Sequence, residues 1–290
     1  MVELTASDVL TKEVLDWQGL HLFHFSGSSC SQKLRIYLNL KGIAATLHHI
    51  NLVKYENETD WYMGINPRGL VPTLVDDGRV IIESNDIIAY LEEKHPNPAL
   101  IPENRRDEVN ALLDFEDHLH MDLRALTMRF FVPSAIVQRS EAQLAHYQAA
   151  GSGRVQGAAD QHKGDEMAFW RDMKDHKGVL ETRTKAAVTA FRAAFDAHEA
   201  TLAEQPYLMG DTLTVLDVAW YVYVKRLTDA GYPLAHLRPR IGEWFGALNQ
   251  QKTLRREVGV PLSLRLVSAG LRLVHRIKGK NIESYLSRKL

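Results

Sequence analysis

The chain has 290 residues, of which 45% are hydrophobic and 24% are charged, with 35 Lys and Arg against 36 Asp and Glu. This length and apolar content favour two folded domains and exclude a disordered or fibrous protein. The balanced charge gives no support for nucleic-acid binding, and the single cysteine, Cys30, excludes both an internal disulfide framework and a cysteine-built zinc site, so we expect no metal.

The first part of the chain predicts a strand, a helix and a second strand. Residues 1–8 hold early acids and no long apolar run, so we expect neither a signal peptide nor an anchor, and we expect a cytoplasmic protein. Residues 20–25 alternate with strand period, and the Ser/Gly cluster at residues 26–29 can end the strand and cap a helix. The apolar spacing of residues 32–41 alone would also suit a strand, but the cap before it and Gly42 after it favour a helix. With a strand at residues 45–52, this part becomes a parallel βαβ unit.

A hairpin and a helix follow. Residues 70–75 and 79–82 flank an Asp-Asp-Gly turn, and Pro72 lies where a strand should begin. Ser84 can cap a helix that runs to Lys94, which gives the order βαβ and then ββα of a thioredoxin-like domain over residues 1–98. The proline-rich link at residues 95–102 marks the domain boundary.

The remainder, residues 104–290, predicts an all-helical domain. Its first segment carries apolar residues at helical spacing: Val109, Leu112, Leu113, Phe115, Leu119, Leu123 and Leu126. A glycine-rich stretch at residues 151–157 interrupts the pattern, and residues 138–180 around it form an insertion between two long helices. Thr214 and Asp217 form a capping box, which predicts a buried helix through Val224.

The C-terminal tail is basic and amphipathic. Residues 261–290 hold seven Lys or Arg and one acid, a net charge of +6, whereas the rest of the chain carries −7. Within residues 262–277, six apolar residues follow helical spacing: Leu264, Val267, Leu271, Leu273, Val274 and Ile277. This face either docks on the acidic body of the protein or lies on an anionic membrane. We expect docking, because a lipid-facing helix usually carries bulky aromatic anchors, whereas this apolar stripe holds no Trp or Phe and is interrupted by Gly270.

Four motifs in this order resemble the cytosolic glutathione transferases, over roughly residues 20–250. Residues 27–31, Gly-Ser-Ser-Cys-Ser, are similar to the signature at the first helix of the zeta class. Residues 66–72, Asn-Pro-Arg-Gly-Leu-Val-Pro, resemble the family's cis-proline loop, and Glu83-Ser84 resembles the pair that holds the γ-glutamyl end of glutathione. The Thr214 to Asp217 box is similar to the family's folding motif in the helical domain.

The resemblance implies glutathione as cosubstrate and a hydroxyl group that activates its thiol. A donor at a helix N-terminus stabilises the thiolate, which is the nucleophile. Ser28 is the first candidate for this donor, with Ser29 and Cys30 next. The alternative for the two serines is that they only cap the helix. Cys30 is either a nucleophile that forms a mixed disulfide or, as we expect, a small buried residue.

The resemblance also implies the remaining glutathione contacts. A cis Pro72 would expose the backbone of Val71 to the cysteinyl part, whereas a trans proline would only mark an edge strand. Ser84 offers a hydroxyl and backbone N–H groups to the γ-glutamyl carboxylate. Glu83 either holds the adjoining ammonium or only starts the helix, and Lys54 either reaches the glycine carboxylate or stays solvated.

The electrophile pocket is expected between the domains, where clefts usually lie. We propose four apolar residues as its lining, although core packing is the commoner role of such side chains: Met128, Phe130, Phe131 and Trp170.

The class within the family is open. Gln32-Lys33 departs from the zeta pattern, and residues 60–62 together with the insertion look more like the bacterial β-aryl etherases of lignin breakdown. Residues 31–33 and the basic tail resemble the ganglioside-induced differentiation-associated proteins, which are transferase-like and membrane-linked.

The predicted function is therefore a glutathione S-transferase that adds the thiol to a small hydrophobic, aromatic electrophile, with cleavage of a β-aryl ether as the first specific reaction. The alternatives are a zeta-like cis-trans isomerase of the maleylacetoacetate type and a transferase-like protein that binds a ligand or membrane without turnover. The apolar helix expected from Asn104 onward needs a partner surface, which in the resembling family makes a homodimer.

Overall fold

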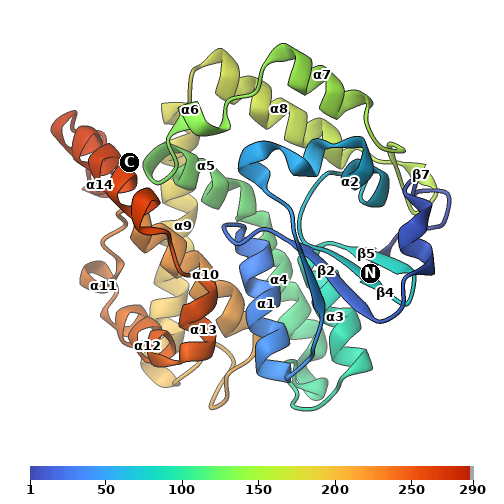
Figure 1. Ribbon diagram of the computed structural model, residues 1–290. Coiled ribbons are helices and arrows are strands. Elements are labelled where there is room, and N and C mark those ends of the chain that lie inside the picture. Colours follow the sequence, from blue (N-terminus) through green and yellow to red (C-terminus); the bar gives the residue numbers. More distant parts are fainter. Residues whose placement is uncertain (288–290) are drawn as a thin grey trace. The chain divides into compact units, whose positions relative to one another are not determined.

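The computed structural model describes residues 1–287, which form two compact units (Figure 1). The first, here called the thioredoxin-like unit, comprises Met1–Pro98 and Gln138–Asp175. The second, the helical unit, comprises Ala99–Val137 and the chain from His176 onward. Two residues of the predicted basic tail, Arg288 and Lys289, lie outside the described residues.

The thioredoxin-like unit is built on one mixed sheet. Its strands are β1 (Val2–Glu3), β2 (Leu20–His24), β3 (Thr46–His49), β4 (Thr73–Asp76) and β5 (Arg79–Ile82). They lie in the order β1-β5-β4-β2-β3, in which only the β2–β3 pair is parallel. The predicted parallel pair and hairpin are confirmed. The edge strand β1 was not predicted, because two residues carry no periodicity; the backbone N–H of Val2 donates to the carboxylate of Asp86 at 3.0 Å.

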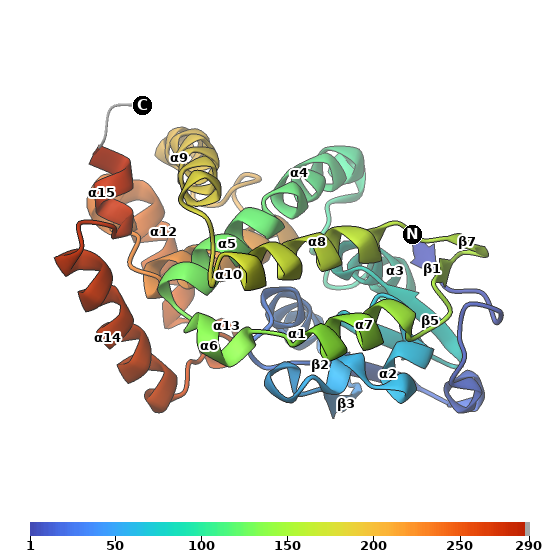
Figure 2. The same ribbon diagram turned by 90° about the horizontal axis from the view of Figure 1, so that it is seen from above.

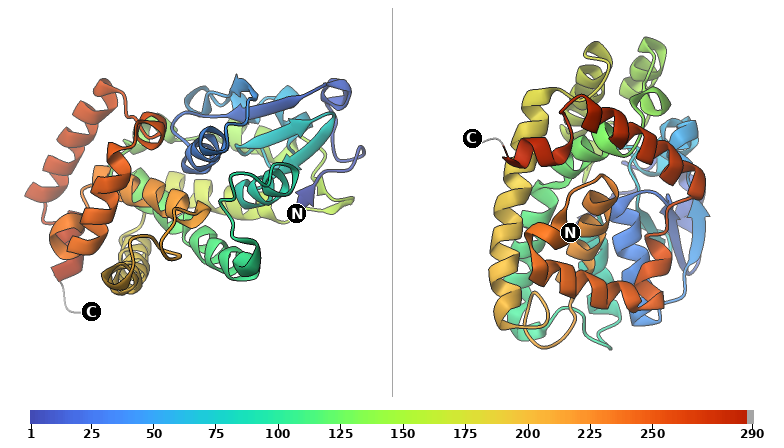
Figure 3. Two further views of the ribbon diagram at one scale, coloured as in Figure 1. Left: turned by 90° about the horizontal axis from the view of Figure 1, so that it is seen from below. Right: turned by 90° about the vertical axis from the view of Figure 1, so that its left-hand side faces the viewer.

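Three helices cover this sheet. They are α1 (Ser29–Lys41), α2 (Asp60–Ile65) and α3 (Ser84–Lys94), with short 3-10 turns at Lys12–Asp16, Leu52–Lys54 and Glu56–Glu58. Helices α1 and α3 pack together on one face, and α2 lies on the other (Figures 1 and 3). Helix α1 begins at a Ser28 cap and ends at Gly42, whose φ of 68° is the left-handed conformation that glycine adopts at low cost.

A buried charged cluster joins α1 to α3. The ammonium of Lys41 lies 3.0 Å from the carboxylate of Glu92, and both side chains are almost fully buried. The hydroxyl of Tyr37 donates to the same carboxylate, and Lys41 also donates to the carbonyl of Pro98 at 2.6 Å. Because each charge is paired and hydrogen-bonded, this contact fixes the helix pair and the start of the interdomain link.

The insertion belongs to the thioredoxin-like unit. It contains α7 (Glu141–Ala149), β6 (Arg154–Val155), β7 (Ala158–Ala159) and α8 (His162–Asp175). Leu144, Tyr147 and Met167 form an apolar cluster with Met63 of α2, so α7 lies beside α2 (Figure 2). Chain order alone predicts residues 138–180 within the helical domain, but Gln138–Asp175 pack with the thioredoxin-like unit instead. The insertion also contains a two-stranded ribbon, β6–β7, that is not predicted from the sequence.

The helical unit holds the remaining helices. They are α4 (Arg106–His118), α5 (His120–Phe130), α6 (Ser134–Val137), α9 (Glu181–Glu204), α10 (Val215–Asp229), α11 (Leu234–Leu237), α12 (Pro239–Gln250), α13 (Lys252–Glu257), α14 (Leu262–Ile277) and α15 (Ile282–Ser287), with a 3-10 turn at Glu103–Arg105. The first apolar segment is two helices, because the chain bends at Leu119 between α4 and α5.

The predicted capping box is confirmed at the start of α10. The carboxylate of Asp217 accepts from the backbone N–H of Thr214 at 2.9 Å and from its hydroxyl at 3.0 Å. It also accepts from Leu208 N–H at 2.9 Å and from the indole of Trp244 at 3.1 Å. Asp217 is fully buried, so these four donors replace its water and tie α10 to α12.

Candidate functional site

Sheet register gathers the predicted glutathione contacts at one end of the sheet. Thr73, the first residue of β4, pairs with Phe23 near the end of β2 and with Ile82 at the end of β5. The segment that leads to Ser28 follows β2, and Glu83-Ser84 directly follows β5. The chain therefore brings three separate motifs to one edge from which backbone and side-chain groups can converge on a ligand.

Ser28 occupies the N-cap of α1. Its Oγ accepts from the backbone N–H of Ser31 at 3.3 Å, and its hydroxyl donates to the carbonyl of Val71 at a long 3.5 Å. A hydroxyl can accept and donate at once, so Ser28 can keep its capping bond while a sulfur anion replaces the Val71 carbonyl as the acceptor of its proton. The capping role and the thiol-activating role of Ser28 are therefore compatible.

The turn before Ser28 is held by side chains from α1. Gln32 donates to the carbonyl of Ser26 at 3.0 Å, and Arg35 donates to that of Phe25 at 3.2 Å. The ammonium of Lys33, which is buried, donates to the amide oxygen of Asn85 in α3 at 2.7 Å. The Gln32-Lys33 pair, which departs from the zeta pattern, thus supports the turn and the α1–α3 contact.

Ser29 and Cys30 are the first two residues of α1. Ser29 is buried, and Cys30 is half-buried. Both lie in the first turn, where backbone N–H groups and the helix dipole favour negative charge. Ser28 remains our first candidate, and its hydroxyl lies beside the backbone of Val71.

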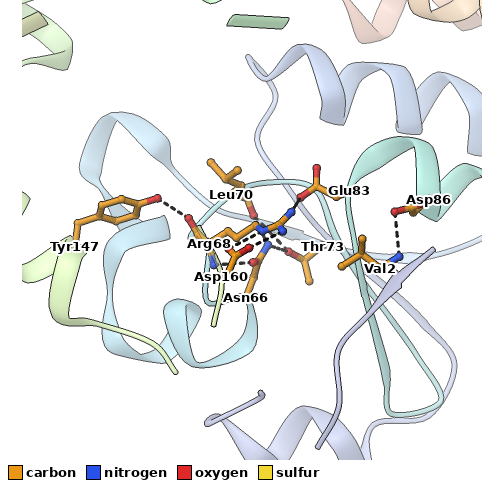
Figure 4. A network of polar contacts seen from close by, with 9 residues as sticks. All are labelled: Val2, Asn66, Arg68, Leu70, Thr73, Glu83, Asp86, Tyr147 and Asp160. Atoms are coloured by element: carbon orange, nitrogen blue, oxygen red, sulfur yellow. Dashed lines mark hydrogen bonds and ion pairs between the residues drawn. The ribbon is translucent and has the colours of Figure 1, made fainter. Parts of the chain in front are cut away.

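The peptide bond between Val71 and Pro72 is cis, as predicted. A network of side chains fixes the loop that precedes it (Figure 4). The Asn66 amide donates to the carbonyl of Leu70 at 3.0 Å and to the hydroxyl of Thr73 at 2.9 Å. The Tyr147 hydroxyl, from the insertion, donates to the carbonyl of Arg68 at 2.7 Å.

Arg68 links this loop to the insertion and to Glu83 (Figure 4). Its guanidinium makes a two-point contact with the carboxylate of Asp160, Nε to Oδ2 at 2.9 Å and Nη2 to Oδ1 at 2.8 Å. Its third nitrogen donates to Glu83 Oε1 at 2.5 Å. Burial acts to raise the pKa of Asp160, but the hydrogen bonds and charge of Arg68 outweigh it and hold that pKa below its ordinary value.

Glu83 has a φ of 66°, the left-handed region that a glutamate rarely adopts. Such conformations persist where surrounding contacts impose them, and they cluster at ligand sites. Its side chain is half-buried and remains partly open to solvent beside Arg68. Ser84, the first residue of α3, is buried, and its helix N-terminus offers backbone N–H groups to an anion.

The structure adds little support for the predicted roles of Lys54 and of the four predicted pocket residues. Lys54 lies in the turn Leu52–Lys54 with an exposed side chain, as either interpretation of it requires. Phe130 and Phe131 are buried in the helical unit, where Phe130 packs on His275 and Tyr285, and Met128 is half-buried there. Trp170 belongs to the thioredoxin-like unit, where the guanidinium of Arg139 lies 3.5 Å from its ring centre. The two phenylalanines therefore pack in the core of the helical unit and do not line a pocket together with Trp170.

Three residues of this site were missed. Arg68 stood within the quoted loop without a role, and Tyr147 and Asp160 lie in the insertion, about 80 to 90 positions further along the chain. No periodicity or spacing connects such positions. The opposite charges of Arg68 and Asp160 are the only sequence feature that suggests a contact. The chain holds 35 basic and 36 acidic residues, so charge alone cannot select this pair.

Comparison with known proteins finds the same family for both parts of the chain. The model of the glutathione S-transferase N-terminal domain matches residues 22–99, and that of the C-terminal domain matches residues 165–247. A zeta-class glutathione S-transferase from Euphorbia esula is 46% identical over 83 residues, which span 29% of this chain and only 37% of that protein. A maleylpyruvate isomerase from Ralstonia sp is 31% identical over 205 residues, which span 68% of this chain and 77% of that protein.

Two solved structures show the same fold. The β-etherase LigF from Sphingobium sp. strain SYK-6 has a TM-score of 0.70 and 22% identity, covering 83% of this chain and 98% of that one. A maleyl pyruvate isomerase, described as a bacterial zeta-class transferase, has a TM-score of 0.55 and 27% identity, covering 82% and 95%. A thioredoxin-like domain followed by an all-helical domain is the fold that this chain shares with them. The chain belongs to the glutathione S-transferase family.

Proposed function

We propose that the protein binds glutathione at the sheet edge formed by Ser28, Val71, Glu83 and Ser84, and that Ser28 activates the thiol. The observation that carries this proposal is the 3.5 Å approach of the Ser28 hydroxyl to the carbonyl of Val71, beside a cis Pro72. A cysteinyl group paired with the backbone of Val71 would place its sulfur next to a hydroxyl donor at a helix N-terminus. The thiolate then attacks a hydrophobic electrophile.

The first reaction that we propose is cleavage of a β-aryl ether. Residues 60–62 and the insertion support it through their resemblance to the bacterial β-aryl etherases, and the insertion lies on the same unit as the glutathione contacts. In this reaction the thiolate displaces an aryl oxide: the carbon–sulfur bond forms, the carbon–oxygen bond breaks, and the phenol leaves with a proton. Of the four side chains predicted to line the electrophile pocket, we retain half-buried Met128 and Trp170 as candidates, whereas Phe130 and Phe131 are buried in the core of the helical unit.

Cis-trans isomerisation is the second candidate. It is favoured by the 31% identity with a maleylpyruvate isomerase over two thirds of this chain. Here the thiolate adds to a double bond, the carbon–carbon bond rotates, and glutathione leaves again, so no glutathione is consumed.

A substrate screen separates these proposals. Purified protein is incubated with β-aryl ether, maleyl and halo-aromatic substrates, with and without glutathione. Ether cleavage consumes one glutathione per phenol released, whereas isomerisation consumes none. If no substrate turns over and glutathione binds, the protein is the non-catalytic alternative. A homodimer and a cytoplasmic location also stay predictions.

A further inference from the structure

Helix α14 rests on the helical unit by one narrow face (Figure 3). Ser268 is fully buried, and its hydroxyl donates to the carbonyl of Phe131 at 2.6 Å. Arg272 donates to the carbonyl of Asp229 at 2.5 Å, and the ring of His275 lies 5.1 Å from that of Phe130. Three polar side chains thus make the specific contacts of the docked face. Of the predicted apolar stripe, only Leu264 and Leu271 are half-buried, and its other four residues are exposed, so docking by the whole stripe is wrong.

The opposite face of α14 is apolar and exposed. Residues spaced by four, seven and four positions lie along one side of a helix. The four that do so here are more than half exposed: Leu262 at 69%, Leu266 at 66%, Leu273 at 59% and Ile277 at 78%. Val267 and Val274 lie beside them and are 49% and 46% exposed. Six large apolar side chains on one 16-residue helix form a continuous patch, which marks an interaction surface rather than scattered exposure.

Basic residues border this patch. A helix turns by about 100° per residue, so Arg265 and Arg276 lie along one border of the stripe and Lys278 along the other. All three are exposed, and Arg265 and Arg276 form no ion pair with the residues that the structure describes. The helix sequence from Leu262 to Ile277 contains no acidic residue.

The basic residues beside the apolar face distinguish two possible partners, a second copy of this chain and an anionic lipid surface. A second copy of this chain would bring the same face against itself, and two α14 helices would then bring unpaired cations together with no acid on either. An anionic lipid surface accepts both parts of the pattern, because lipid tails take the apolar stripe and headgroups take the bordering cations. No helix among the described residues is long and apolar enough to cross a membrane.

We propose that α14 binds the surface of anionic membranes, with its axis parallel to the bilayer and Leu266 and Leu273 inserted below the headgroups. This inference is independent of the proposed chemistry, since the contacts of α14 involve none of the proposed glutathione ligands.

Vesicle sedimentation of the full chain tests the proposal. Vesicles of phosphatidylcholine alone are compared with vesicles that also contain phosphatidylserine. We expect severalfold more protein to pellet with the anionic vesicles. Most of this binding should be lost at about 0.5 M salt, because screening shortens the range of the electrostatic attraction to a few Å.

Paired variants locate the binding surface. Leu266→Ser with Leu273→Ser, and separately Arg265→Gln with Arg276→Gln, should each abolish most of the pelleting. The matched control is Leu10→Ser with Leu47→Ser, which removes two apolar residues of the other unit that are 54% and 52% exposed, and it should pellet like the wild type. Because all six side chains are exposed, circular dichroism should show unchanged folding.

Three results would overturn the proposal. The first is equal pelleting with the two kinds of vesicle, or none. The second is binding that survives both pairs of α14 substitutions. The third is a dimer, seen by light scattering, that dissociates on Leu266→Ser with Leu273→Ser, since a second copy would then cover this face.

Discussion

At the scale of single residues, Arg68 divides its guanidinium between two carboxylates. Two of its nitrogens contact Asp160 of the insertion, and the third contacts Glu83, the proposed partner of the glutathione ammonium. We therefore predict that Asp160 acts as a positioning residue, because its contact with Arg68 limits how strongly that guanidinium pairs with Glu83.

We predict that Asp160→Asn weakens glutathione binding. With Asp160 neutral, Arg68 pairs more strongly with Glu83 and competes with the ammonium of glutathione. The expected loss is about tenfold in affinity, comparable to one hydrogen bond to a charged group. Steady-state kinetics should show a higher KM for glutathione at an unchanged kcat. Asp165→Asn, at an exposed position of α8 five residues further along the chain, is the control, and equal behaviour of the two variants would refute the positioning role.

The same residue predicts a pH dependence. The folded-state pKa of Asp160 lies below the unfolded value of about 3.9, so its stabilising contribution is complete above that value and is lost as pH falls through the folded pKa. Urea unfolding at a series of pH values should show wild type more stable than Asp160→Asn at pH 7, with the difference shrinking below about pH 4. A difference that is constant down to pH 2 would contradict the ion pair.

At the scale of elements, buried charges join the helices of the thioredoxin-like unit. Lys41 and Glu92 form the contact between α1 and α3, and Tyr37 completes it. Breaking a buried pair leaves one charge without compensation, which costs much more than the pair contributes when intact.

We therefore predict that Glu92→Ala lowers the free energy of unfolding by about 3 to 5 kcal/mol. The matched control is Glu93→Ala, which removes an exposed carboxylate one position further along the same helix and should cost less than about 0.5 kcal/mol. Chemical denaturation of both variants measures the effect. Similar losses for Glu92→Ala and Glu93→Ala would mean that the buried pair does not stabilise the fold.

The elements also show how far sequence reasoning reaches. Local signals located β2, β5, α3 and the Thr214 capping box, because alternation, turns and caps act within a few residues. The cis form of Pro72 followed from the family motif. The insertion's attachment could not be predicted, since it depends on Arg68 meeting Asp160 across 92 positions. In α14, helical spacing found the helix but not its docked face, because Ser268 and Arg272 make hydrogen bonds there, whereas Leu262, Leu266 and Leu273 remain exposed.

At the scale of the whole molecule, the predicted dimer and the proposed membrane contact use different surfaces. The predicted homodimer needs an apolar surface, and α4 offers Phe115, which is 45% exposed. This surface is distinct from the exposed face of α14, so dimer formation and vesicle binding can be disrupted independently.

We predict a dimeric mass by light scattering at micromolar concentration and a shift toward monomer in Phe115→Ser. Removing an aromatic anchor from the centre of an interface typically costs about 2 kcal/mol or more of binding energy. Leu237→Ser, which alters another exposed apolar residue of the helical unit, is the control. A monomeric wild type would contradict the prediction.

The central claim, that Ser28 lowers the pKa of bound glutathione's thiol, is tested by titrating the ultraviolet absorbance of the thiolate in the glutathione complex. We predict that this pKa lies below the ordinary thiol value of about 8.5 and returns toward it in Ser28→Ala, with turnover reduced by about one to three orders of magnitude and glutathione affinity little changed. Ser26→Ala, at an exposed serine of the same turn, should behave like the wild type. An unchanged thiol pKa in Ser28→Ala, together with loss of activity in Cys30→Ala, would contradict the account.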